Sequence, residues 1–432
     1  MTETHHSSGA AAPAPATASR PRVAVVTMGV KLGHETRGYT RFRVISEMLA
    51  EAGFEVDLIT SSFQHWDKAP RDTAHPSYTG LPYRISFIHE PGYRRNLDLA
   101  RIRSHRVAAR NLRAHFDRIF AEGPGYRLIY AEIPPNDVAR VCAQEAQRHG
   151  IPFVADVNDL WPEAMRMVLN VPILSDMAFY PFARDAKIAY RLLSAAVGTS
   201  EEYAARPAAD RTRPYERLCV YVGNRLDEFD AGAQRRAADV RKPAGELWAA
   251  YAGTLGASYD LATLVRAAQQ AEQRRMPGEP RLRVKVLGDG PDRAALEALA
   301  QQLKAPVDFV GYAPYDLMAA YLSASDIVVN SLVRSAPQSI VTKIGDYLAS
   351  GSALVNTGSS PEMRALVSEG DVGLNVEAEN EQALCDALET LMRDPDGRAR
   401  MAENGRRLAE LRFDQRTSYL PIVDMVRRLA CD

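Results

Sequence analysis

The sequence has few cysteines, and their spacing argues against two kinds of scaffold. Only four occur among 432 residues: Cys142, Cys219, Cys385 and Cys431. No two of them form a Cys-x-x-Cys pair, which argues against a structural zinc site and against a disulfide framework. Sparse, unpaired cysteines suit a reducing compartment, and we expect a cytoplasmic protein.

Long apolar runs are also missing. No run approaches the roughly 18 residues that a membrane-crossing helix requires. Residues 1–20 are rich in Ala, Pro, Ser and Thr and have no apolar signal core. They are predicted to be a disordered lead, not a signal peptide.

Neither the charge nor the common ligand motifs indicate nucleic acid, metal or a redox cofactor. Lysine and arginine total 53 against 54 acidic residues, so the chain is not expected to attract nucleic acid. The nine histidines form no His-x-x-x-His pair, and Met28-Gly-Val-Lys-Leu-Gly33 is not the dinucleotide fingerprint Gly-x-Gly-x-x-Gly. Asp394-Pro-Asp396 is formally Asp-x-Asp, but its place between two polar helices favours a capping turn over a metal site. We therefore expect no metal and no cofactor.

The sequence does contain two series of alternating strands and helices. The first has predicted strands at residues 23–27, 55–60, 84–88, 128–130, 153–157 and 195–199, a helix at about 38–52, and a candidate last strand at 219–222. The second series starts at 248–252 and ends near 374–376. The pattern predicts an α/β protein with two Rossmann-like parallel-sheet domains, residues 21–225 and 247–410, joined by a polar linker at 226–246.

The most informative segment is residues 335–351, which lies between two buried strands. It is predicted to be a loop and a helix at the carboxyl end of a strand, where open α/β sheets bind ligands. Lys343 and Asp346 are three residues apart, so they share one helix face, where they suit diphosphate charge and ribose hydroxyls. The alternative is an ordinary surface ion pair.

Several ordered motifs surround this segment. Gly288-Asp-Gly-Pro291 follows a strand, and Phe309-Val-Gly311 ends the next. An Ala-Asp-Ile strand is followed by Asp346-Tyr-Leu-Ala-Ser-Gly351. In these motifs the chain resembles the family 4 glycosyltransferases, which have the GT-B fold, over most of residues 248–432 and more weakly over 21–215. In the family's GT-B fold the last helix crosses back to the first domain, which implies the same for residues 411–432.

The resemblance also implies a set of site residues. The family places two acids eight residues apart, and here Gln338 replaces the first and Asp346 the second. The cation that usually follows the Gly253-Thr-Leu-Gly256 turn is missing, which leaves its role to Lys343 or, more weakly, Lys285. The implied catalytic residues are Lys343, Gln338 and Asp159. The implied donor-binding residues are Gly33, Arg37, Gly253, Thr254, Gly256, Gly288, Gly290, Ser339, Ile340 and Asp346.

The acceptor side is predicted from the first domain. The long loop 29–41 is rich in glycine and basic residues and is expected to face the interdomain cleft; a solvated surface loop is the alternative. Asp159-Leu-Trp-Pro-Glu163 resembles a sequence of bacterial polysaccharide glycosyltransferases. Asp159 and Glu163 would bind sugar hydroxyls and Trp161 would stack on a sugar, although Asp159 could equally cap a helix.

Residues 93–118 hold eight arginines and two aspartates. In enzymes of this family that elongate lipid-linked glycans, such a segment rests on the inner membrane leaflet, so we expect peripheral membrane contact. A solvated helix face is the alternative.

The resemblance implies a retaining, metal-independent glycosyltransferase of the hexosyl or N-acetylhexosaminyl class. Its donor would be a UDP- or GDP-sugar, and its acceptor a glycan or lipid-linked glycan of a bacterial surface polysaccharide. Two alternatives remain open: a nucleotide-sugar 2-epimerase of similar fold, and a non-catalytic nucleotide- or glycan-binding partner, which Gln338 favours.

Overall fold

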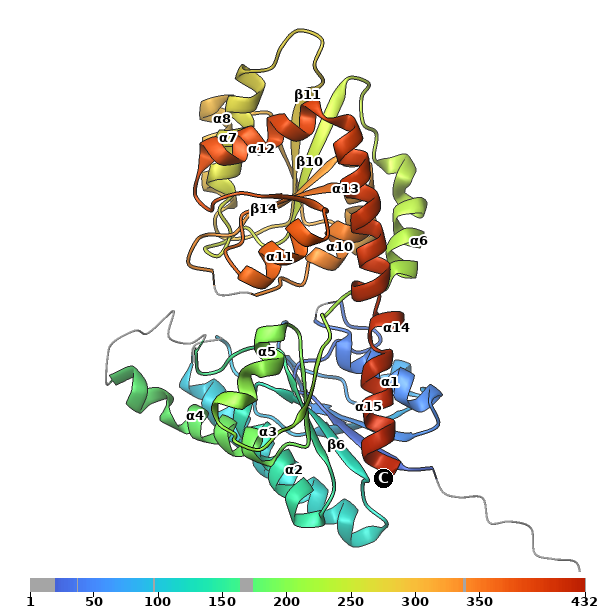
Figure 1. Ribbon diagram of the computed structural model, residues 1–432. Helices are drawn as coiled ribbons and strands as arrows, with labels where there is room; N and C mark the ends of the chain where they lie inside the picture. The colour runs from blue at the N-terminus through green and yellow to red at the C-terminus, as the bar shows by residue number, and fades with distance from the viewer. Residues whose placement is uncertain (1–19, 37, 96–97, 164–173, 337–338, 432) are drawn as a thin grey trace, which may run out of the picture.

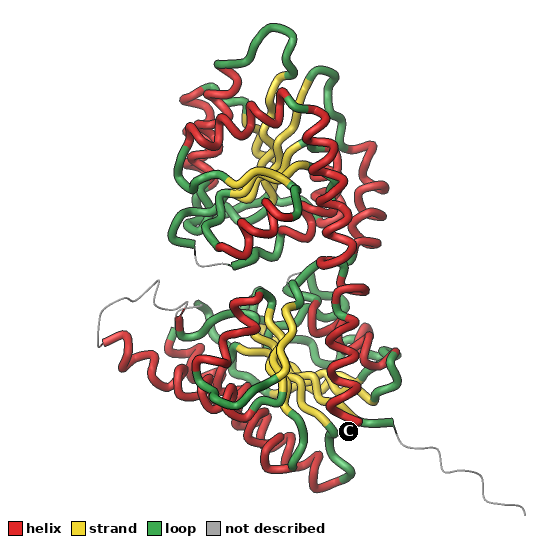
Figure 2. The backbone as a smooth tube through the Cα atoms, in the orientation of Figure 1, coloured by secondary structure: helices red, strands yellow, loops and turns green. Residues whose placement is uncertain are grey.

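The computed structural model describes residues 20–36, 38–95, 98–163, 174–336 and 339–431. The predicted lead, except Arg20, therefore lies outside the described residues. Two α/β domains lie one above the other, each a parallel sheet between layers of helices (Figures 1 and 2). The predicted fold class, two Rossmann-like parallel-sheet domains, is confirmed.

The first domain is built on a seven-stranded sheet of order β5-β2-β1-β6-β7-β8-β9. Its strands are β1 (Arg22–Val26), β2 (Glu55–Ser61), β5 (Arg84–Ile88), β6 (Leu128–Ile133), β7 (Phe153–Val157), β8 (Ala195–Gly198) and β9 (Glu216–Cys219). All pairs are parallel, and the central strands are almost fully buried, which explains their near-continuous apolar sequences. The expected last strand at 219–222 lies three residues earlier, because Val220 and Tyr221 already lead out of the sheet. A short hairpin, β3 (Phe63–Gln64) and β4 (Ala69–Pro70), stands beside it.

Three long helices cover one face of this sheet. They are α2 (Leu99–Glu122), α3 (Asn136–His149) and α4 (Leu174–Leu192), and α3 packs against both of the others. The opposite face carries α1 (Arg41–Glu51). The short α5 (Glu201–Ala205) follows β8 and begins at its cap Ser200, whose hydroxyl accepts from the Tyr203 N–H.

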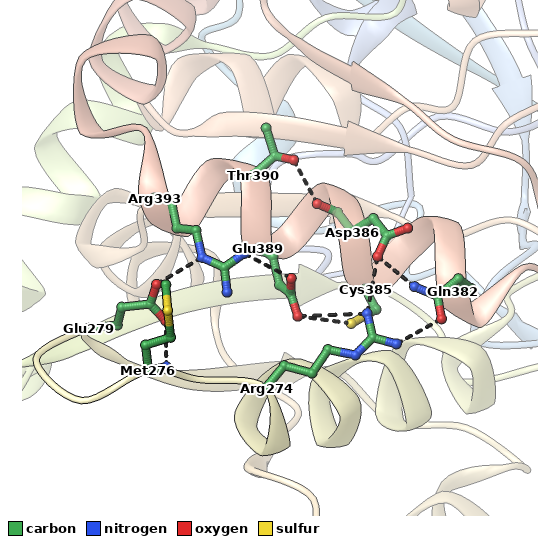
Figure 3. A network of polar contacts seen from close by, with 9 residues as sticks. All are labelled: Arg274, Met276, Glu279, Gln382, Cys385, Asp386, Glu389, Thr390 and Arg393. Atoms are coloured by element: carbon green, nitrogen blue, oxygen red, sulfur yellow. Dashed lines mark hydrogen bonds and ion pairs between the residues drawn. The ribbon is translucent and has the colours of Figure 1, made fainter.

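The second domain has a six-stranded sheet of order β12-β11-β10-β13-β14-β15. Its strands are β10 (Glu246–Ala252), β11 (Arg281–Leu287), β12 (Val307–Gly311), β13 (Ile327–Asn330), β14 (Ala353–Asn356) and β15 (Gly373–Asn375). Its helices are α7 (Leu261–Gln273), α8 (Arg293–Leu303), α9 (Tyr315–Ala324), α10 (Ile344–Ala349), α11 (Pro361–Glu369), α12 (Glu381–Arg393) and α13 (Pro395–Leu408). On the outer side, Arg274 at the end of α7 pairs with Asp386 and Glu389 of α12, as Figure 3 shows.

Residues 226–246 differ from the expected linker. They contain α6 (Leu226–Arg236), which packs against α9 of the second domain. Leu226, Phe229 and Gly232 form its buried stripe, and Phe229 is fully buried in the core around Tyr347. The polar composition concealed a helix whose few buried residues are spaced three apart.

The end of the chain returns to the first domain. After α13 a π-helical turn (Ala409–Phe413) and the short α14 (Gln415–Ser418) lead to α15 (Leu420–Cys431), which runs down beside α1 and β6 (Figure 1). Tyr419, Ile422, Met425 and Val426 are buried in the same core as the strands of the first sheet. None of the helices in the described ranges has the length and apolarity that a bilayer crossing demands.

Candidate functional site

A cavity of about 510 Å³ lies where the carboxyl ends of the two sheets meet. From the first domain it is lined by residues that end or follow β1, β6, β7 and β8, and from the second by Tyr259, Ile340, Val341 and Thr342. Carboxyl ends of parallel strands are where α/β sheets bind ligands. Both domains therefore contribute to one site.

Aromatic rings form much of the first-domain wall. Tyr39 is half exposed and meets Trp66 edge to face, with ring centres 5.4 Å apart. Trp161 is stacked on His105 at 6.2 Å, and the Arg101 guanidinium lies 4.6 Å from the Trp161 ring. Aromatic walls with a few fixed polar groups are typical of small-molecule sites and offer flat faces to a sugar ring.

Glu132, near the end of β6, supplies a carboxylate to this cavity. It accepts a hydrogen bond of 2.6 Å from the Thr27 hydroxyl and bonds from the N–H groups of Met28 and Gly29. Burial, together with the nearby Asp156 carboxylate, raises the pKa of Glu132 to about 7. Glu132 can therefore hold or release a proton near neutral pH. Sequence analysis missed it because the predicted strand ended at Tyr130 instead of Ile133.

Asp159 lines the cavity and holds its aromatic neighbour in place. Its carboxylate accepts from the Trp161 indole N–H at 3.0 Å and from the Leu160 N–H at 2.8 Å. Burial raises the pKa of Asp159. Glu163 instead pairs with Arg206 at 2.6 Å and is not among the lining residues.

The predicted glycine-rich loop reaches the cavity at its ends, not at Gly33. Val30 and Tyr39 form a β-bridge, which folds the middle of the loop away so that Gly33 packs against Ser77. Gly29 and Tyr39 line the cavity instead. The prediction for Gly33 was wrong in this respect, and Arg37 lies outside the described residues.

In the second domain, two glycine turns pack directly on each other. Gly288 has a positive φ of 132°, and a Cβ there would lie 1.8 Å from the Gly253 carbonyl oxygen. The Leu255 N–H donates to the Asp289 carbonyl at 3.0 Å. A Cβ at Gly290 would clash with Leu255 in the same way. Glycine is thus required here for backbone packing at the ends of β10 and β11. Within this turn Thr254 is exposed and Gly256 is buried.

Lys343 immediately precedes α10 and extends toward the first of these turns. Its Nζ lies 4.2 Å from the centre of the Tyr251 ring and 3.9 Å from that of Tyr259. A Cβ built on Gly253 would be 2.6 Å from this Nζ. The buried Nζ has no hydrogen-bond partner among the described residues, and burial lowers the pKa of Lys343 to about 7. An unsatisfied buried ammonium is poised for an anionic ligand.

Asp346 has other neighbours than Lys343. Its Oδ1 accepts from the Asn224 amide at 2.6 Å and from the Tyr315 hydroxyl at 2.7 Å, and burial raises the pKa of Asp346. The alternative, an ordinary surface ion pair between Lys343 and Asp346, is wrong, because neither group has the other as a partner. Lys285 is bound to Asp308 at 2.7 Å and lies over the Trp248 ring, away from the cavity.

Ser339 and Ile340 lie where the loop before α10 meets the first domain. Ile340 lines the cavity, and the Ser339 hydroxyl donates to Glu362 at 3.0 Å. Glu362 also accepts from the Glu201 N–H and the Tyr221 hydroxyl, both at 3.0 Å, and so joins the two domains. Sequence analysis missed Glu362, although Ser360-Pro-Glu after a buried strand indicates a helix start. Gln338 lies outside the described residues.

Metal-ligating side chains do not gather anywhere in the part of the chain that the structure describes: no group of three or more could hold an ion. Asp394 caps α13 by accepting from the Gly397 N–H at 2.8 Å, as its sequence context predicted. The expectation of metal-independent activity stays a prediction.

Comparison with known proteins finds a family that the second domain resembles. Residues 248–394 match the family model described as glycosyl transferases group 1. Over these residues the chain is similar to the group 1 glycosyl transferases. The matched region contains Lys343, Asp346 and both glycine turns. The predicted resemblance to GT-B glycosyltransferases is thereby confirmed.

Other similarities extend beyond the matched region. An alpha-D-kanosaminyltransferase of Streptomyces kanamyceticus is 25% identical over 276 residues, 59% of this chain and 69% of that protein. Sucrose-phosphate synthase of Thermosynechococcus elongatus shares the fold with a TM-score of 0.67 and 19% identity, over 95% of this chain and all of that one. HepE of Anabaena, solved in complex with UDP and glucose, has a TM-score of 0.64 and 15% identity, with coverage of 95% and 100%.

Proposed function

We propose that this glycosyltransferase transfers a hexosyl or N-acetylhexosaminyl group from a UDP- or GDP-sugar to a glycan or lipid-linked acceptor, with retention of configuration. The proposal is carried by one observation: the matched region presents a buried Lys343 Nζ, without a hydrogen-bond partner among the described residues, beside the glycine turn at Gly253. A cation beside a glycine turn suits a diphosphate.

The donor would lie along the ends of β10, β11 and β13. Its diphosphate would contact Lys343 and the turn at Gly253, and Asp346 would approach the ribose with the carboxylate oxygen that Asn224 and Tyr315 leave unused. The HepE complex with UDP and glucose supports a nucleotide-sugar donor on this fold.

The acceptor would occupy the aromatic part of the cavity. Tyr39 and Trp161 offer ring faces, and Asp159 and Glu132 offer carboxylates for hydroxyl groups. The likeness of residues 159–163 to bacterial polysaccharide glycosyltransferases supports a surface polysaccharide or lipid-linked glycan as the acceptor. Contact of the basic segment 93–118 with the inner membrane leaflet would bring such an acceptor to the cavity.

In the proposed reaction the bond from the sugar to the diphosphate breaks first and leaves an oxocarbenium-like centre. Lys343 and the backbone N–H groups stabilise the charge that gathers on the leaving diphosphate. The acceptor hydroxyl attacks from the same face and gives its proton to the departing phosphate oxygen. No dedicated side-chain base is needed.

The test is a panel of UDP- and GDP-sugars incubated with the purified full chain, with and without short glycan and lipid-linked acceptors. We expect release of nucleoside diphosphate. We also expect the transferred sugar to have the same anomeric configuration, axial or equatorial, as in the donor, which the anomeric proton coupling in NMR measures. Inversion would overturn the retaining mechanism. Isomerised sugar with free nucleotide would identify a 2-epimerase, and binding without turnover a non-catalytic partner.

A further inference from the structure

A second groove, of about 380 Å³, lies on the helical face of the first domain between α2 and α4, over α3. Five arginines line it: Arg106, Arg110, Arg113, Arg140 and Arg184. Among the lining residues only Asp137 and Asp185 are acidic. The groove is therefore strongly basic, although the chain as a whole has a net charge of −1.

Three of the arginines are already held by the protein. Arg140 and Arg184 share the Asp185 carboxylate, at 3.2 Å and 2.9 Å. Arg113 pairs with Glu145 at 3.4 Å. Burial raises the pKa of Asp137 to about 6, so its carboxyl is still mostly ionised at neutral pH. These pairs fix the walls of the groove without neutralising it.

Arg106 and Arg110 differ from the other three. Both are exposed, and neither makes a hydrogen bond or ion pair with any residue in the described ranges. They lie four residues apart on α2 and so share one face, where like charges repel each other. Two adjacent free guanidinium groups match the geometry of phosphate oxygens, to which arginine can donate two parallel hydrogen bonds.

The groove and the interdomain cavity share a wall. His105 lines both, and it is the residue before Arg106 in the sequence. Because His105 also stacks on Trp161, the Trp161 side of the cavity and the basic groove lie one side chain apart. The two openings thus suit two successive parts of one molecule.

Exposed apolar side chains stand at one end of the groove. Leu99, Met177 and Tyr180 are 82%, 71% and 64% exposed. Each lies within about one turn of a lining residue, Ile102 on α2 or Pro181 on α4. Since α2 and α4 each connect parallel strands, their N-terminal ends lie at the same edge of the sheet (Figure 1). A ligand with an apolar part close to its charged group fits this arrangement.

We propose that the groove binds the phosphate groups of a lipid-linked acceptor, with Arg106 and Arg110 as their direct ligands. This inference rests on the proposed function and narrows its acceptor to one that carries phosphate next to the sugar. The acceptor sugar lies in the cavity against Trp161, and the phosphates lie beyond His105 between the two arginines.

The experiment measures binding of farnesyl diphosphate to the full chain, with farnesol and inorganic pyrophosphate as comparison probes. Arg106→Gln/Arg110→Gln should weaken farnesyl diphosphate binding at least about tenfold, because both charged donors are lost. The matched control is Arg103→Gln/Arg118→Gln, which removes the same charge from α2 outside the groove. It should change the affinity less than about twofold, since exposed charges away from the ligand are screened. Pyrophosphate should compete with farnesyl diphosphate for binding. Farnesol should bind both double variants with the same affinity as the wild type.

Three outcomes would overturn the inference. The first is equal weakening by the two double variants, which would reduce the effect to net charge. The second is loss of binding to phosphatidylglycerol vesicles in Arg106→Gln/Arg110→Gln with farnesyl diphosphate affinity intact, which would make the groove a membrane contact. The third is absence of farnesyl diphosphate binding to wild type at millimolar concentration.

The proposed function fails separately from this inference. A wild-type protein that binds farnesyl diphosphate but neither binds nor turns over any nucleotide sugar would refute only the proposed glycosyl transfer. A protein that turns over a nucleotide sugar but ignores farnesyl diphosphate would refute only the groove.

Discussion

The six strands of the second sheet follow the same order as the first six of the seven-stranded first sheet, yet corresponding strands end in different side chains. In the first domain β6 carries Glu132 and β7 carries Asp156. In the second domain the corresponding β13 and β14 end in Asn330 and Asn356. The Asn330 amide donates to Asn356 at 2.8 Å, and Asn356 donates to Asn375 of β15 at 2.8 Å.

Of these four side chains only Glu132 lines the cavity, whereas Asp156, Asn330 and Asn356 are fully buried. A carboxylate suits the sugar of the acceptor, whose hydroxyl groups donate hydrogen bonds. It would repel a diphosphate on the donor side, whereas neutral amides and glycine turns do not. One topology thus supports two sites of different charge, because topology fixes where the strands end and the terminal side chains fix what can bind there.

The largest expected effect, on stability, comes from replacing the buried Asp156 of the first domain by asparagine, the residue at the corresponding strand end of the second domain. Asp156 is fully buried and accepts from Arg41 Nε at 2.9 Å and from the Tyr130 hydroxyl. Asp156→Asn leaves the buried Arg41 charge unpaired, so the free energy of unfolding should fall by about 3–5 kcal/mol. Urea unfolding of the full chain measures this. A loss below about 1 kcal/mol would mean that the Val220 and Tyr221 carbonyls, which Arg41 also contacts, are sufficient partners.

The second largest effect is expected from removing Lys343, the cation proposed to contact the donor diphosphate. Lys343→Ala should lower kcat by about 100-fold or more, on the scale of removing one preorganised donor to developing charge, with a smaller effect on donor affinity. Lys343→Gln should restore little, because the charge is still missing. Steady-state kinetics with a UDP- or GDP-sugar provide the measurement. Lys285→Ala is the matched control, since Lys285 is bound to Asp308, and should leave kcat nearly unchanged.

A smaller loss is expected for the proposed ribose contact. Asp346→Ala should weaken nucleotide binding by about 1–3 kcal/mol, the scale for a charged hydrogen-bond acceptor. Calorimetry measures the affinity. Tyr315→Phe removes a donor to the same carboxylate but leaves the charge in place, and it should retain most of the affinity. Unchanged nucleotide binding by a folded Asp346→Ala protein would exclude the ribose role.

Glu132 of the first domain should also affect how the free energy of unfolding depends on pH. Burial raises the pKa of Glu132 to about 7 from an ordinary value of 4.5. Between these values the folded state binds the proton more tightly than the unfolded state, so this group's contribution to stability falls as pH rises and is constant above about 7. Glu132→Gln should remove that fall, about 2–3 kcal/mol between pH 5 and 8. Parallel pH profiles of wild type and variant would contradict the shift.

The smallest expected effect is none at all. Sugar transfer should survive EDTA, because the proposed charge stabilisation comes from Lys343 and backbone N–H groups. Initial rates before and after chelation measure this. Activity lost in EDTA and restored by Mn²⁺ would show that the donor side needs a metal after all.

Sequence reasoning was most successful where burial was one-sided or complete. The strands β5 and β7 were predicted with the bounds that the structure has, because short apolar runs between turn residues have few other interpretations. It was less successful at α6, whose few buried residues are diluted by charge. The bounds of β6 were set too early at Tyr130, and this hid Glu132.

Site residues on regular elements were easier to place than those on loops. Gly288 and Gly253 were assigned to turns by the glycine pattern, but sequence could not show that the two turns pack on one another. Gly33 was assigned to the cavity, yet the bridge between Val30 and Tyr39 turns it toward Ser77. The partners of Asp346, Asn224 and Tyr315, are 122 and 31 residues away, and no local pattern encodes such contacts.

The return of α15 to the first domain has a consequence for how the protein is made. The first sheet emerges from the ribosome long before Tyr419, Ile422, Met425 and Val426, which complete its core. Domains usually fold as they emerge, from the N-terminus onward. Here the apolar face of the first domain that α15 covers stays open to solvent while the entire second domain is synthesised, and the nascent chain needs protection at that face until residues 420–431 have left the exit tunnel.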